Sequence, residues 1–145
     1  GETRLAALAA DLLYVTDGEI TLELKGLPAG SYSFTSYHLE PFFELENMGF
    51  LRGASDTEAQ TIVAELDGRE MGRVTGTSLG PAGLDRVRIA DRDIPRLSFV
   101  FTTDGARPVT ITLRGTTVYG GGDYPTHPDT VFVALNGFAI GTLLP

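Results

Sequence analysis

Short segments in which apolar and polar residues alternate, each ended by turn residues, limit most strongly what this chain can fold into. In residues 19–25, for example, Ile20, Leu22 and Leu24 alternate with polar or charged side chains. A period of two places successive side chains on opposite faces of a β-strand, so each such segment predicts a strand with one buried face. The strands predicted in this way are residues 19–25, 31–38, 62–66, 69–74, 84–90, 97–103, 109–113, 131–135 and 138–144.

Two dipeptides predict tight turns between neighbouring strands. Asp67-Gly68 separates residues 62–66 from 69–74, and Asn136-Gly137 separates residues 131–135 from 138–144. Asx-Gly pairs accept the left-handed backbone that a two-residue hairpin turn requires. Each dipeptide therefore predicts a β-hairpin.

The strands predict an all-β fold with at most one short N-terminal helix, because only Leu5, Leu8 and Leu12 show helical spacing, within residues 5–13. Without a second helix there is no parallel crossover, and every strand has an apolar face to bury. We therefore expect a two-sheet antiparallel β-sandwich of the jelly-roll type. The 145 residues fit a single domain spanning residues 1–145.

Composition excludes several classes of function. The chain has no cysteine, which rules out disulfides, zinc–thiolate sites and cysteine nucleophiles. Its net charge of -8 disfavours nucleic acid and anionic membranes as partners, because both carry negative charge. No apolar run approaches the roughly 20 residues that cross a bilayer. We expect no nucleic-acid partner and no membrane partner.

Motifs of enzymes are absent from the sequence. It contains no HExxH, GxSxG or P-loop pattern, and its two histidines, His38 and His127, belong to no metal-binding spacing. We therefore expect no enzymatic activity. A small hydrolase that uses His38 or His127 with Glu40 stays open as an alternative.

The segment Tyr37-His38-Leu39-Glu40 is the first candidate binding site, because it lies where a predicted strand passes into the longest loop. A tyrosine ring can cover the C–H face of a sugar, while imidazole and carboxylate groups bind its hydroxyls. The alternative is structural: Tyr37 lies on the outer face of the sheet, and His38 hydrogen-bonds a loop backbone.

The loop of residues 120–129 is the second candidate. Its three consecutive glycines and two prolines can present Tyr124 as a stacking ring, with Asp123 and His127 as hydrogen-bonding partners. The alternative is a connector whose tyrosine caps the edge of the sandwich. A structural calcium ion is a further expectation, with Asp123, Asp129, Asp56, Glu58 and Asp104 as oxygen donors, against the alternative that these acids are simply solvated.

The sequences GLPAGSYSFTSYH at residues 26–38 and LNGFAI at residues 135–140 carry a family resemblance. Over residues 11–144 the chain resembles bacterial β-sandwich carbohydrate-binding modules of the galactose-binding-like and malectin-like type. The resemblance implies sugar binding through loops at one end, at times with a structural calcium. The matching positions here are Tyr37, His38, Glu40, Tyr119, Asp123 and Tyr124. The chain departs from such modules in having no tryptophan, so that tyrosine would have to stack on the sugar.

The resemblance also implies a function and a location. It predicts a non-catalytic module that binds a polysaccharide or oligosaccharide and is tethered to a catalytic domain in a larger, secreted or cell-surface bacterial protein. The alternative is a structural or adhesive β-sandwich without a glycan site, which packs against a partner domain through Phe42, Phe43 and Phe50.

Overall fold

The computed structural model describes most of the predicted strands and part of the segments that connect them. The described residues are 13–15, 18–38, 40–41, 61–75, 78–79, 94–116, 118–119, 130–131 and 133–143. Within them the strands are β1 (Leu13–Val15), β2 (Glu19–Leu24), β3 (Gly30–Tyr37), β4 (Glu40–Pro41), β5 (Thr61–Leu66), β6 (Arg69–Thr75), β7 (Ser78–Leu79), β8 (Arg96–Thr103), β9 (Val109–Gly115), β10 (Val118–Tyr119), β11 (Thr130–Val131), β12 (Val133–Leu135) and β13 (Gly137–Thr142). This part of the chain contains no helix that is long and apolar enough to cross a membrane.

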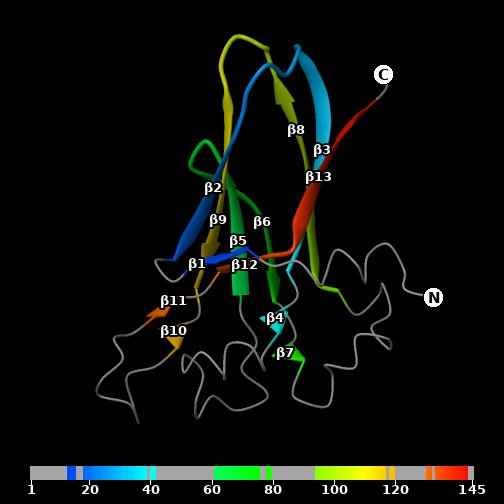
Figure 1. Cartoon of the computed structure of the whole chain (residues 1–145). Helices are drawn as coiled ribbons and strands as arrows, with labels where there is room; N and C mark the ends of the chain where they lie inside the picture. Colours follow the sequence, from blue (N-terminus) through cyan, green and yellow to red (C-terminus); the bar gives the residue numbers. More distant parts are fainter. Residues whose placement is uncertain are drawn as a thin grey trace, which may run out of the picture.

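Seven of the strands form two antiparallel sheets that pack face to face (Figure 1). One sheet has the strand order β2-β9-β5-β6, and the other has the order β13-β3-β8. The antiparallel pair β1-β12, the antiparallel pair β10-β11 and the parallel pair β4-β7 complete the described strands. The predicted two-sheet antiparallel β-sandwich is confirmed.

The way the chain crosses between the sheets is that of a jelly roll. β2 pairs with β9 in one sheet while β3 pairs with β8 in the other, so a two-stranded ribbon passes from sheet to sheet. The connections β2–β3 and β8–β9 lie together at the upper end of Figure 1. They touch at Gly105, whose φ is 74° and where an added Cβ would lie 2.7 Å from the backbone nitrogen of Ala29. Only glycine fits this crossing without displacing the neighbouring connection.

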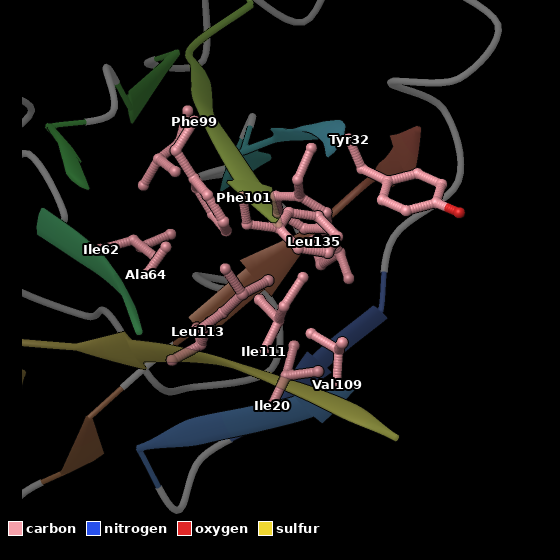
Figure 2. Packing of buried hydrophobic residues seen from close by; sticks show 13 residues of the cluster. Ile20, Tyr32, Ile62, Ala64, Phe99, Phe101, Val109, Ile111, Leu113 and Leu135 are labelled. Atoms are coloured by element: carbon pink, nitrogen blue, oxygen red, sulfur yellow. The ribbon is translucent and has the colours of Figure 1, made fainter. Parts of the chain in front are cut away.

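The core fills the space between the two sheets, because the alternating apolar residues of both sheets point inward. Phe34, Ile111 and Leu113 are completely buried, and Figure 2 shows Ile111 and Leu113 facing Phe99 across the interior. The rings of Phe34 and Phe99 pack with centroids 5.1 Å apart. Burying side chains of this size contributes about 1.5–3 kcal/mol each. The buried cluster comprises Ile20, Tyr32, Phe34, Ile62, Ala64, Leu97, Phe99, Phe101, Val109, Ile111, Leu113, Val133 and Leu135.

One predicted hairpin is confirmed and the other is wrong. Asp67 and Gly68 have φ values of 48° and 85° and join the paired strands β5 and β6. By contrast, β12 pairs with β1 and β13 pairs with β3. Asn136 therefore connects two strands that do not pair with each other. Neither Asn136 nor Gly137 has a positive φ. The second dipeptide therefore does not form a hairpin turn.

The N-terminal helix is not seen where the structure can test it. Leu13, the last residue of the predicted helix, is the first residue of β1 and pairs with Leu135. Residues 5–12 and the predicted strand 84–90 lie outside the described residues. Phe42, Phe43 and Phe50, on which the partner-packing alternative rests, also lie outside them.

Candidate functional site

The outward side of β3 displays the predicted residue Tyr37. Tyr32, Phe34 and Ser36 point into the molecule and are buried, so the alternate residues face outward and are half-buried. Tyr37 therefore lies on the outer face of the three-stranded sheet, as the structural alternative predicted. This position also leaves its ring at the molecular surface.

The neighbours of Tyr37 differ on its two sides. On β8, Arg96 is its register partner, and the Arg96 guanidinium carbon lies 5.9 Å from the centroid of the Tyr37 ring. This distance is within the range of a cation–π contact. On β13 the partner is Gly137, which has no side chain to place beside the ring. A ligand can therefore approach Tyr37 from the β13 side.

The rest of this outer surface is made of small and hydroxyl-bearing residues. Thr35 lies opposite Ser98, and their hydroxyl oxygens are 2.9 Å apart at an exposed position. The next row contains Ser33 beside Val100, which is 55% exposed. We refer to this surface as the Tyr37 face; it consists of Ser33, Thr35, Tyr37, Arg96, Ser98, Val100, Gly137, Ala139 and Gly141.

The outer surface of the other sheet has a different chemistry. Arg114 donates a hydrogen bond of 2.8 Å to Glu65, and Arg73 donates two hydrogen bonds to one carboxylate oxygen of Glu70. These exposed pairs satisfy their own charges and add little to stability. The Tyr37 face instead offers a ring and uncharged hydroxyls, which suit a ligand rich in hydroxyl groups.

His38, predicted to contact a sugar, lies inside the protein instead and is only 2% exposed. Its Nδ1 is 2.6 Å from the carbonyl oxygen of Ala134, and its Nε2 is 2.7 Å from Oγ of Ser36. A carbonyl only accepts, so Nδ1 carries the proton, and in the neutral ring Nε2 accepts from the Ser36 hydroxyl. Both ring nitrogens are occupied, and no sugar can reach them. The predicted direct role of His38 does not fit this geometry. The structural alternative is met in part: His38 does bond a backbone carbonyl, but that carbonyl belongs to strand β12 and not to a loop.

Burial also determines the protonation of His38. Loss of solvation in the interior lowers the pKa of His38 below its usual value of 6.5, and the hydrogen bond to the Ala134 carbonyl opposes this only in part. The Ser36–His38 distance equals that of a nucleophile and its base, but Ser36 is 0% exposed. No substrate reaches this hydroxyl. The Ser36 hydroxyl instead holds the His38 ring, whose other nitrogen bonds the Ala134 carbonyl and thereby connects the end of β3 to β12.

The remaining predicted site residues are not brought into one described site. Glu40 lies in β4 and Tyr119 in β10, short strands for which the structure describes the backbone pairing. Asp123, Tyr124 and His127 lie outside the described residues.

The structural calcium ion stays a prediction, because most of its expected oxygen donors lie outside the described residues. Of the expected oxygen donors, only Asp104 is described, and its Oδ1 accepts a 2.8 Å hydrogen bond from the Ala106 backbone. Asp56, Glu58, Asp123 and Asp129 lie outside the described residues. Among the residues that are described, no three His, Cys, Asp or Glu side chains gather as metal ligands would.

Sequence reasoning missed Arg96, Thr35 and Ser98 as members of the site. The alternation around Phe34 places Thr35 and Tyr37 on one face, so the signal for Thr35 was present. Arg96 and Ser98 join them only through the pairing of β3 with β8, two strands that are distant in the sequence.

Comparisons with known proteins agree with the fold. No family model matches the sequence, and no curated protein matches it. The structure is similar to that of the EclA C-terminal domain, described as a sugar-binding protein, with a TM-score of 0.52 and 15% identity, covering 90% of this chain and 76% of that chain.

A second similar structure is BtGH115A, a family GH115 4-O-methyl-α-glucuronidase with specificity for decorated arabinogalactans. Its TM-score is 0.52 at 12% identity, and the match covers 92% of this chain but only 14% of the glucuronidase. At these identities the two likenesses show the fold alone. This chain therefore has a β-sandwich fold that also occurs in a sugar-binding protein and within a much longer glycosidase chain.

Proposed function

We propose that this domain is a non-catalytic carbohydrate-binding module that holds a polysaccharide or oligosaccharide on the Tyr37 face. The observation that carries the proposal is the combination of a surface tyrosine ring with Arg96 on one side and a side-chain-free glycine on the other. A sugar ring can stack its C–H face on such a tyrosine. The exposed hydroxyls of Thr35 and Ser98 follow along the same face.

The polar groups beside the ring match what sugar hydroxyls require. Two hydroxyl groups carry two hydrogens, and the bond between Thr35 and Ser98 uses one of them. One hydrogen and several lone pairs remain for a ligand. Arg96 adds N–H donors next to the ring, and donors and acceptors together can bind vicinal sugar hydroxyls.

The shape of the face favours the interior of a glycan chain. Gly137, Ala139 and Gly141 keep the β13 edge low, so no β13 side chain on this face blocks a glycan chain that lies across the strands. A face of this kind makes few contacts with each sugar, and we expect dissociation constants in the micromolar to millimolar range.

The comparisons support the same class of function. One similar structure is named a sugar-binding protein and the other a glycosidase. The proposal includes tethering of this domain to a catalytic domain in a larger, secreted or cell-surface protein, where it would keep the enzyme near its polysaccharide.

Affinity electrophoresis in gels that contain neutral or acidic plant and algal polysaccharides tests the proposal, with and without a calcium chelator. We expect Tyr37→Ala to weaken retention at least tenfold with only a small change in melting temperature, because the ring is half-buried on the outer face of the sheet and not part of the core. Phe138→Ala is the aromatic control for retention alone, since Phe138 is 44% exposed and lies off the Tyr37 face, while its ring stacks on Phe34 with centroids 5.9 Å apart and its loss lowers stability. Equal retention of Tyr37→Ala and the parent protein on every retaining polysaccharide would reject the Tyr37 face.

A further inference from the structure

A hollow lies at the end of the sandwich opposite to Tyr37. It has a volume of about 620 Å³ and is open to solvent. Pockets of 300–1,000 Å³ are typical of small-molecule sites. It is formed where β8 passes into β9 and where β5 turns into β6, toward the upper end of Figure 1. Its lining residues are Leu66, Asp67, Thr102, Thr103, Asp104, Arg107, Pro108 and Val109.

The first carboxylate of the hollow is held in place by the backbone. Asp67 adopts a left-handed φ of 48° in the β5–β6 turn. Its backbone N–H donates to the Thr110 carbonyl at 2.9 Å, and its Oδ1 accepts from the Thr110 N–H at 3.2 Å. The bond to Thr110 holds the carboxylate through Oδ1. The other oxygen, Oδ2, accepts no hydrogen bond from the described residues. Asp67 therefore offers a fixed acceptor.

The second carboxylate is fixed in the same manner. Oδ1 of Asp104 accepts from the Ala106 N–H at 2.8 Å, and the Thr103 hydroxyl accepts from the Gly105 N–H at 3.1 Å. The turn cannot shift easily, since Gly105 packs closely against the neighbouring backbone of Ala29. Preorganised acceptors of this kind cost little ordering entropy when a ligand binds.

The hollow also offers hydrogen-bond donors and an apolar wall. Arg107 is exposed and forms no ion pair with any residue in the described part of the chain, so its guanidinium N–H groups can meet a ligand. Pro108 is exposed beside it and can contact C–H groups. Thr102 adds an exposed hydroxyl.

We propose that this hollow is a second ligand site and that its ligand is a neutral saccharide unit. Paired carboxylates with a guanidinium and hydroxyls bind sugar hydroxyls from both the acceptor and the donor side. The lining carries two carboxylates and one guanidinium, so an anionic ligand meets net repulsion in a protein of charge -8. The guanidinium likewise disfavours a bare cation.

The hollow is separate from the Tyr37 face. Along the β3–β8 pair, Tyr37 is opposite Arg96 and Gly30 is opposite Thr103. At 3.3 Å per residue, these two ends are about 23 Å apart. One sugar cannot touch both places. Ligand binding in the hollow therefore does not depend on whether the Tyr37 face binds a glycan.

Amide NMR spectra of the whole chain test this site. The probes are the methyl glycosides of galactose, glucose, mannose, xylose and arabinose, with glucuronic acid as the anionic comparison. We expect at least one neutral probe to shift the amide signals of Asp67, Ala106 and Thr110 in a saturable manner at millimolar concentration. Asp104→Asn keeps the acceptor for the Ala106 N–H but replaces the other oxygen with a donor and removes the charge, and Arg107→Gln removes the cation.

Each of these two variants should weaken that binding at least fivefold. Glu19→Gln, the same acid-to-amide change at the opposite end of β2, where the register partner is Arg114, and Tyr37→Ala should leave it unchanged. The proposal is overturned if no neutral probe gives saturable shifts, if either hollow variant binds as the parent does, or if glucuronic acid binds more tightly than methyl glucoside. Binding at the hollow that disappears in Tyr37→Ala would also overturn it. Retention through the Tyr37 face is measured independently, so failure of one site does not imply failure of the other.

Discussion

Removal of one buried hydroxyl gives the sharpest test of how β3 is tied to β12. Ser36 is 0% exposed, and its hydroxyl donates to Nε2 of His38 at 2.7 Å, while Nδ1 of the same ring donates to the Ala134 carbonyl. Ser36→Ala leaves Nε2 as a buried acceptor without a donor. An unsatisfied buried polar group costs about 1–3 kcal/mol, so we expect the free energy of unfolding to fall by that amount.

Ser98→Ala is the matched control for this prediction. It removes an identical hydroxyl that also forms one hydrogen bond, the 2.9 Å contact with Thr35, but at an exposed position where water replaces the partner. Its expected cost is within about 0.5 kcal/mol.

Urea unfolding at pH 7.5, followed by circular dichroism, measures both variants against the parent chain. Unchanged m-values would show that the difference lies in the folded state. If Ser36→Ala loses no more stability than Ser98→Ala, the buried hydrogen bond to His38 does not contribute as argued, and the neutral ring with its proton on Nδ1 is the wrong assignment.

Two further predictions concern His38 and Gly105. Burial lowers the pKa of His38, so the unfolded chain binds a proton that the folded chain does not; this contribution is absent well above pH 6.5 and destabilises the protein as the pH falls below it, by at most about 1.4 kcal/mol per pH unit. An NMR titration in which the His38 ring protonates at or above pH 6.5 would contradict it. Gly105 and Gly26 share a φ of 74°, but only at Gly105 does an added Cβ meet backbone, 2.7 Å from the nitrogen of Ala29. Gly105→Ala should therefore lower the melting temperature by several degrees more than Gly26→Ala, whose cost is conformational strain of about 1–2 kcal/mol, and calorimetry showing equal losses would refute the crowding.

The strands could be predicted from the sequence because their signal is local. Ile20, Leu22 and Leu24 alternate with polar residues whatever their partners are, and one buried face is enough to define β2. Asp67-Gly68 likewise forms its turn within four residues. The fold class follows from many such segments, and it needs no knowledge of which strand pairs with which.

The features that depend on distant partners could not be predicted in this way. Asn136-Gly137 has the composition of a hairpin turn, but the strands on its two sides pair with β1 and β3, so the local signal was misleading. The environment of His38 depends on the carbonyl of Ala134, near the other end of the chain. A residue at the end of a strand can point to solvent or inward, and only the position of β12 decides which.

The pairing pattern also affects how the molecule forms. β3 carries Tyr37 and is bonded on one side to β8 and on the other to β13, two strands that follow much later in the chain. During synthesis on the ribosome, β8 emerges well after β3, and β13 emerges later still. Pairing between remote segments closes long loops and is intrinsically slow. The surface that we propose to bind glycan is thus complete only after β13 has paired with β3, even if β8 is already in place.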